Sequence, residues 1–137
     1  MRLFLACAAA LLLCLEGAFG AYNPALLGTL AGGFEGAVST QSGTTYTLAA
    51  ADCGTTIEFT SASAITVTLP NSLSPGCHIA VEQNGAGQIT FSAASGATLQ
   101  SAHSFTKTFG QYAIVGLSVL SNSGGSAAVW TLSGDGA

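Results

Sequence analysis

The stretch ITVTLPNSLSPGCHIAVEQNGAGQITF, residues 65–91, decides the fold class. Hydrophobic side chains alternate with polar or small ones in three runs, at 65–69, 79–83 and 89–91, and β-branched residues and Phe are prominent in them. A period of two places one face of a strand in a core and the other in solvent, and β-branched residues favour strands. The stretch therefore predicts three short strands.

Turn-forming residues separate these runs. Pro70 and Pro75 cannot donate a hydrogen bond to a sheet, so the segment between them is expected to be a loop. Asn84-Gly85 is the strongest hairpin signal in the chain, because a type I′ turn needs positive φ at both central residues. We therefore expect a hairpin at Asn84-Gly85.

The same alternation continues on both sides of this stretch, at 45–48, 57–59 and 129–132. Residues 112–120 are almost continuously apolar, which is typical of a strand buried on both faces. Turn signals recur every 8–15 residues and no segment has helical periodicity. Residues 44–137 are therefore predicted to form an all-β domain, an antiparallel β-sandwich or barrel-like fold of about eight short strands.

The N-terminal part of the chain has a different composition. Arg2 is followed by an apolar run at 3–15 and then by small residues, with cleavage favoured after Gly20. This order is typical of a secretory signal peptide, and 13 residues are fewer than the roughly 20 that span a bilayer as a helix. We expect a leader at 1–20 and a Gly/Ala-rich arm or linker at 21–43. An uncleaved anchor and a buried hydrophobic N-terminus are the alternatives.

Removal of the leader leaves two cysteines, Cys53 and Cys77, which could form a disulfide in an oxidising compartment. Both are expected at the start of a strand. Neighbouring antiparallel strands would place these starts at opposite ends, whereas a disulfide needs Cα atoms within about 7 Å. The pair can therefore be bridged only if the two strands run parallel or lie in facing sheets. Two buried free thiols are the alternative.

The charge balance excludes several classes of partner. Only 6% of the residues are charged, and the only basic residues besides histidine are Arg2 and Lys107. A nucleic-acid binder neutralises phosphates with several Lys or Arg side chains, and an anionic membrane surface attracts basic clusters. We therefore expect no nucleic-acid partner, and no membrane contact once the leader is removed.

Catalytic and cofactor-binding motifs are absent from the sequence. It has no nucleophile elbow, phosphate-binding loop, HExxH or calcium loop, and the cysteines and histidines lack zinc-ligand spacing. His78 and His103 are expected to be surface residues and Trp130 a core residue, and the acidic residues show no spacing suggestive of a glycosidase. Thr-x-Thr pairs such as Thr66/Thr68 do not repeat at a fixed period, which argues against an ice-binding array. We expect no enzyme activity, no cofactor and no metal.

Polar loop tips are the expected binding surface, since Ser, Asn and His there can supply adaptable hydrogen bonds. Three loops are candidates, at 71–76, 101–105 and 122–125. Their candidate contact residues are Asn71, Ser72, His103, Ser104, Asn122 and Ser123.

Residues 45–136 also resemble a β-rich domain that recurs in tailed-phage virion appendage proteins, such as tail fibres and head decorations. The matching pieces stand in order at 46–48, 52–54, 65–70, 76, 81–87, 110–113 and 130–135. The resemblance implies a non-enzymatic structural or receptor-contacting module of a phage-like particle. It also implies a homo-oligomer, with a trimer favoured, whose partners are other virion proteins or host-surface glycan.

The leader departs from this pattern, because virion proteins normally assemble in the cytoplasm. The alternative is a secreted or periplasmic bacterial β-sandwich of glycan-binding or adhesin type, encoded by a gene that could derive from a prophage. The expected location is therefore the virion, or the extracellular space or periplasm.

Overall fold

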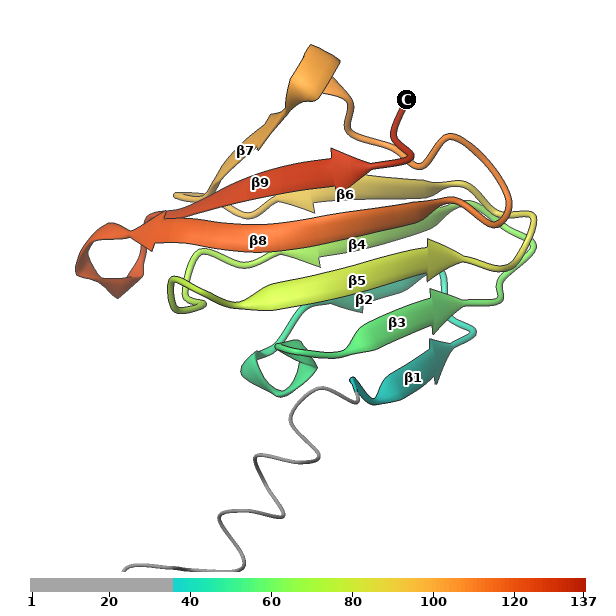
Figure 1. The fold of residues 1–137 in the computed structure, drawn as a ribbon, viewed down its shortest axis with the longest axis horizontal. Coiled ribbons are helices and arrows are strands. Elements are labelled where there is room, and N and C mark those ends of the chain that lie inside the picture. The colour runs from blue at the N-terminus through green and yellow to red at the C-terminus, as the bar shows by residue number, and fades with distance from the viewer. Residues whose placement is uncertain (1–35) are drawn as a thin grey trace, which may run out of the picture. The chain divides into compact units, whose positions relative to one another are not determined.

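The structure, a computed structural model, describes residues 36–137 and is built from strands (Figure 1). Three single-turn 3-10 helices, at 50–52, 102–104 and 123–125, are the only helical segments in this range. The predicted all-β class is confirmed. The strands are β1 Val38–Gln41, β2 Thr45–Thr47, β3 Thr56–Phe59, β4 Ile65–Leu69, β5 His78–Gln83, β6 Ile89–Ala93, β7 Thr98–Ser101, β8 Ile114–Asn122 and β9 Ala128–Gly134.

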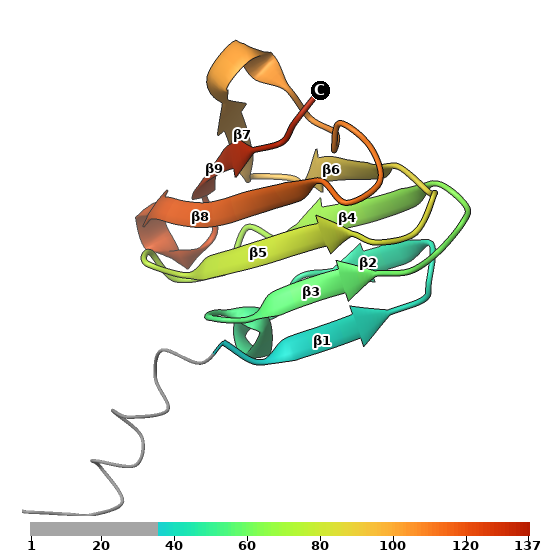
Figure 2. The ribbon, with the colours of Figure 1, turned by 45° about the vertical axis from the view of Figure 1, so that its right-hand side comes forward.

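The strands form two facing sheets, which confirms the predicted sandwich (Figures 1 and 2). We call the six-stranded sheet, in the order β1-β3-β5-β8-β9-β7, sheet A. The three-stranded sheet, in the order β2-β4-β6, is sheet B. Alternate residues of each strand point into the space between the sheets, as the period of two predicts.

The direction of strand pairing differs from the prediction. From β1 to β6 the chain crosses to the other sheet after every strand, so successive strands of one sheet run in the same direction. The pairs β1–β3, β3–β5, β2–β4, β4–β6 and β7–β9 are parallel. Only β5–β8 and β8–β9 have the antiparallel pairing expected throughout. The first six strands therefore wind as coils of a two-sided solenoid, a fold in which each coil packs mainly on its neighbours.

The expected hairpin at Asn84-Gly85 is wrong for the same reason. β5 belongs to sheet A and β6 to sheet B, so these two residues lie in a crossover between the sheets. The glycines there permit close packing of the backbone. A Cβ atom at Gly85 would lie 2.2 Å from the carbonyl oxygen of Ser61, and one at Gly87 would lie 1.9 Å from that of Ser63.

The compact unit that the structure describes begins at Gly36, earlier than the predicted domain boundary at residue 44. Residues 38–41, assigned above to the arm, form β1 and pair with β3. Only one of these four residues is apolar, so alternation could not reveal the strand. The predicted leader at 1–20 and the arm up to residue 35 lie outside the described residues.

The core lies between the sheets and includes Trp130, as predicted. Trp130 and Phe59 are fully buried, and the indole Nε1 of Trp130 donates a hydrogen bond to the carbonyl oxygen of Pro70 at 2.9 Å. Burying a side chain of this size stabilises the fold by roughly 1.5–3 kcal/mol. Within residues 36–137, β8 is covered on one face only, because Ile114 and Leu120 are exposed, so the prediction of burial on both faces is wrong.

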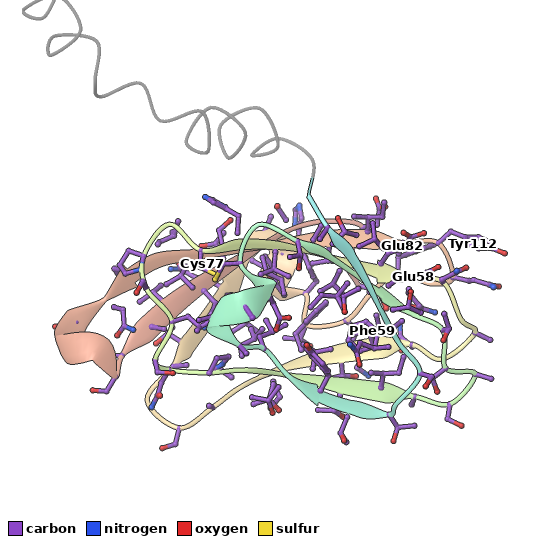
Figure 3. The ribbon with its side chains drawn as sticks, turned by 90° about the horizontal axis from the view of Figure 1, so that it is seen from below. Glu58, Phe59, Cys77, Glu82 and Tyr112 are labelled. Carbon is purple, nitrogen blue, oxygen red and sulfur yellow. A yellow bond between two sulfur atoms is a disulfide. The ribbon has the colours of Figure 1, made fainter. Side chains whose placement is uncertain are left out.

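Cys53 and Cys77 form a disulfide, with their Cα atoms 5.1 Å apart. Cys53 precedes β3 and Cys77 precedes β5, and these neighbouring strands are parallel. The geometric condition derived from the sequence is therefore met. The disulfide lies at the end of the sandwich where β3 and β5 begin, and Figure 3 shows Cys77 at the end opposite Tyr112. Disulfides persist in oxidising compartments, so this bond points to a location outside the cytoplasm.

Candidate functional site

Two exposed aromatic side chains mark the end of sheet A where β5 ends and β8 begins. Phe109 is 77% exposed and Tyr112 is 67% exposed. They border a shallow depression of about 420 Å³, which we call the Tyr112 depression. Its lining consists of Phe109, Gln111, Tyr112, Ala113, Gly134, Asp135 and Gly136.

Tyr112 is held in a backbone conformation that favours glycine. Its φ is 69°, inside the left-handed region. The amide of Ala113 donates to the carbonyl oxygen of Gly110 at 3.1 Å, and the amide of Tyr112 donates to that of Gln83 at 2.6 Å. A bulky residue in this region costs of order 1–3 kcal/mol, and such residues cluster at functional sites. The exposed position of the Tyr112 ring is therefore a candidate functional feature.

Gln83, which anchors this turn, is itself fixed from inside the sandwich. It is buried, and its amide nitrogen donates to the carbonyl oxygen of Gly85 at 3.2 Å. Its amide oxygen accepts a hydrogen bond from the buried hydroxyl of Thr108. This polar pair ties the end of β5 to the segment that carries Phe109. Gln83 shares its face with Ile79 and Val81, so a polar residue at a core position was a signal that the sequence analysis missed.

Asp135 forms the acidic part of the lining. Two backbone hydrogen bonds fix Asp135. The amide of Phe109 donates to the carbonyl oxygen of Asp135 at 2.9 Å, and the amide of Asp135 donates to the carbonyl oxygen of Ile114 at 2.9 Å. Its carboxylate accepts a hydrogen bond from the amide of Ile114 at 3.3 Å. Asp135 is exposed, so the carboxylate can also accept hydrogen bonds from a ligand.

Two further carboxylates lie close to the depression on the outer face of sheet A. Glu58 and Glu82 are opposite each other in the β3–β5 register, and Glu82 is opposite Ile114 in the β5–β8 register. Figure 3 shows both at the end that carries Tyr112. Glu58 accepts hydrogen bonds from the hydroxyl of Thr40, at 2.9 Å, and from the amide of Asn84. The sequence showed no suggestive spacing because parallel pairing brings together residues from different coils.

The predicted contact residues Asn71, Ser72, Asn122 and Ser123 lie at the opposite end of the sandwich. The side-chain amide of Asn122 donates to the carbonyl oxygens of Asn71, at 3.1 Å, and Leu73, at 2.8 Å. That of Asn71 donates to the carbonyl oxygen of Ser95 at 2.8 Å. These two loops do come together, but their amide groups hold the loops in place. Ser72 and Ser123 are exposed.

The third predicted loop lies at the Tyr112 end. His103 and Ser104 are exposed in the 3-10 turn after β7, with φ values of 60° and 58°. A second depression, of about 330 Å³, lies between this turn and the C-terminal segment from Gly134 to Ala137. His78 is exposed at the far end of sheet A, where its Nδ1 lies 2.8 Å from the hydroxyl of Ser118. The structure therefore does not bring the two histidines together.

The outer face of sheet B carries two rows of hydroxyl groups. Thr45, Thr66 and Thr90 are paired across the three strands, and so are Thr47, Thr68 and Ser92. The lack of a fixed sequence period therefore did not reveal that these hydroxyl groups are aligned, because coils of unequal length still place them opposite one another in the sheet. Thr108 lies outside this array and is buried in the core.

Tyr46 and Asp52 form a polar contact at the sheet B side of the core. The hydroxyl of Tyr46 donates to a carboxylate oxygen of Asp52 at 3.0 Å, and the amide of Ala49 donates to the other at 2.8 Å. Burial raises the pKa of Tyr46, and the hydrogen bond to Asp52 and the Asp52 charge raise it further. These contacts are structural and lie away from the Tyr112 depression.

Within residues 36–137, no group of three or more His, Cys, Asp or Glu side chains is arranged to hold a metal ion. No helix in this part of the chain is long and apolar enough to cross a membrane. In comparisons with known proteins, no family model, no curated protein and no solved structure matches the chain.

Proposed function

We propose that this protein is a non-enzymatic module that contacts host-surface glycan through the Tyr112 depression. The observation that carries the proposal is the pair of exposed aromatic side chains, Phe109 and Tyr112, beside a shallow depression on a surface otherwise rich in Ser, Thr and Gly. Exposed aromatic rings on monomeric surfaces are associated with contact sites.

The chemistry of the lining fits a sugar. An aromatic ring can stack on the apolar face of a pyranose, while a carboxylate accepts hydrogen bonds from its hydroxyl groups. Tyr112 and Phe109 supply the rings and Asp135 supplies the carboxylate. Tyrosine is well suited to this role, because it offers a large contact area with few rotatable bonds. An open depression also admits one unit of a longer polysaccharide.

The arrangement of titratable groups favours binding without turnover. Glycosidases place two carboxyl groups on opposite sides of the scissile bond, whereas Glu58 and Glu82 lie side by side on one face of a sheet. Glu58 is also held by two hydrogen bonds. We expect no activity on host polysaccharide. A hydrolytic activity that disappears in the His78→Ala/His103→Ala double variant would contradict this.

The resemblance to phage appendage domains supports a location for this protein on the surface of a phage-like particle. The disulfide favours a second setting, a secreted or periplasmic bacterial glycan-binding or adhesin-type protein, because disulfides form outside the cytoplasm. N-terminal sequencing of the natural protein separates the two. Retention of Met1 supports the particle, and a start near Ala21 supports secretion.

Self-association supports the same function, because several copies raise avidity for a repeated surface ligand. The outer face of sheet B is uncharged on its three strands, and the edge strands β1 and β2 contain no Lys, Glu or Pro that would hinder edge pairing. We expect a homo-oligomer, with a trimer favoured by the resemblance. A stable monomer at micromolar concentration in light scattering would contradict this expectation.

Tyr112→Gly is the most informative variant for the binding site. It removes the ring from a position whose φ favours glycine, so the fold should be at least as stable as in the natural protein. Binding to host cells or to their isolated surface polysaccharide should fall at least about tenfold, measured by biolayer interferometry. Ser123→Ala, at the opposite end, is the matched control. Unchanged binding by Tyr112→Gly would refute the site.

A further inference from the structure

We infer that the Tyr112 depression selects uncharged, hydroxyl-rich glycans and rejects glycans that carry carboxylate or sulfate groups. This inference rests on the proposed function and adds the class of ligand to it. Three carboxylates, set against a single lysine within residues 36–137, carry the argument.

The carboxylates form a line across the outer face of sheet A toward the depression. Asp135 is part of the lining. Ile114, whose amide binds the Asp135 carboxylate, is opposite Glu82, and Glu82 is opposite Glu58. Paired strands place opposite Cα atoms about 4.5–5.5 Å apart, so Glu82 is one strand removed from Ile114. An anionic ligand in the depression would therefore meet Asp135 directly. Glu82 lies two strand spacings from Asp135, roughly 10 Å, which is about one Debye length at 0.1 M salt.

One basic side chain in the described part of the chain lies near this charge. Lys107, the only Lys or Arg within residues 36–137, lies two residues before Phe109, and its backbone is hydrogen-bonded to Ala137 as well as paired with Thr90. It can offset at most one of the three negative charges. His103 is exposed on the separate turn after β7 and is absent from the lining. Proteins recognise carboxylate and sulfate groups with Arg, Lys or clustered backbone amides. The lining offers no Arg or Lys for such a group.

The hydrogen-bonding capacity of Asp135 favours the same ligands. The carboxylate of Asp135 can only accept hydrogen bonds. The side-chain NH2 group of Gln111 uses one of its two donors on the carbonyl oxygen of Asn84, at 2.9 Å, and the Tyr112 hydroxyl can donate or accept. The Asp135 carboxylate therefore favours a ligand that supplies donors, which sugar hydroxyl groups do and carboxylates do not.

The test compares oligosaccharides that carry either a hydroxymethyl group or a carboxylate at C6. The full chain is titrated calorimetrically with gluco-, manno- and galacto-oligosaccharides, and with the matching glucuronate, mannuronate and galacturonate oligomers, at low and high salt. For at least one pair, we expect the neutral oligomer to bind about tenfold more tightly at low salt, as repulsion between charges a few ångströms apart predicts. The ratio should shrink at high salt, because salt screens the carboxylates.

Glu82→Gln should reduce the neutral-to-uronate affinity ratio several-fold, because it removes one repelling charge outside the lining. Ser118→Ala, on the same sheet face but farther from the depression, should leave the ratio unchanged. The inference is overturned if the protein binds a neutral oligomer and its matching uronate with equal affinity, or if Glu82→Gln leaves the neutral-to-uronate affinity ratio unchanged. Either result leaves the proposed function standing. If the folded protein binds none of the six oligomers and no host polysaccharide, the proposed function itself fails, and the inference with it.

Discussion

Reduction of the Cys53–Cys77 disulfide should lower the free energy of unfolding substantially. The bond joins the starts of β3 and β5, two neighbouring parallel strands of sheet A, across a sequence separation of 24 residues. Cys77 is also buried against the core. The disulfide therefore restricts the unfolded chain over the loop that contains all of β3 and β4.

The magnitude follows from the length of this loop. In the chain-entropy model, closing a loop of about 25 residues removes entropy worth about 3.5 kcal/mol from the unfolded state. A domain of about 100 residues loses roughly 4 °C of its melting temperature for each kcal/mol, so reduction should lower Tm by about 15 °C. The total stability of such a domain is only about 5–15 kcal/mol, so the reduced protein should be markedly weaker.

The assay is thermal unfolding followed by circular dichroism, with and without a reducing agent. The Cys53→Ser/Cys77→Ser double variant is the control, since its Tm should be low in both conditions and insensitive to the reductant. It also separates this disulfide from any effect of Cys7 and Cys14. A natural protein whose Tm moves by less than about 3 °C on reduction would refute the entropic reasoning.

Three further predictions concern the stability of the fold. Burial and Asp52 raise the pKa of Tyr46, so the stability that the neutral phenol contributes is complete below pH about 10 and is lost as the pH rises through the raised pKa. Tyr46→Phe should therefore flatten the fall of Tm above pH about 10. Identical alkaline Tm profiles for the variant and the natural protein would contradict this. Gly87→Ala should destabilise by about 1–3 kcal/mol in urea unfolding, because its Cβ would lie 1.9 Å from a backbone oxygen, whereas Gly110→Ala meets no atom within 4 Å and should have little effect. Asn122→Ala should lower the free energy of unfolding by about 1–3 kcal/mol, because it removes hydrogen bonds to the backbone of the 71–73 loop. Ser123→Ala should leave the free energy of unfolding unchanged. Equal urea midpoints for the two variants would be evidence against the structural role of Asn122.

The sequence predicts the strands of this fold better than their partners. Runs such as 65–69 alternate clearly, and each of them became a strand. Alternation has the same period in parallel and antiparallel sheets, so it could not reveal the winding between two sheets. The paired cysteines held the missing information, since they could be joined only if β3 and β5 ran parallel or lay in facing sheets.

The candidate site was harder to predict than the fold. Tyr112 begins a run of apolar residues, and a long apolar run favours burial, yet Tyr112 and Ile114 are exposed. Their exposure results from the turn that follows Gly110 and from the outer face of sheet A, which no further layer covers within residues 36–137. Glu58 and Glu82 meet because of strand register alone. Contacts of this kind depend on tertiary pairing, which local sequence patterns do not contain.

The central claim is that ligand binds at the Tyr112 depression. Backbone amide chemical shifts of the isotope-labelled protein, followed by NMR during titration with a neutral oligosaccharide that it binds, test this claim most directly. We predict that the largest changes occur at Gln111, Tyr112 and residues 134–136, with small changes at 71–76 and 122–125. Changes confined to those two loops would contradict the account.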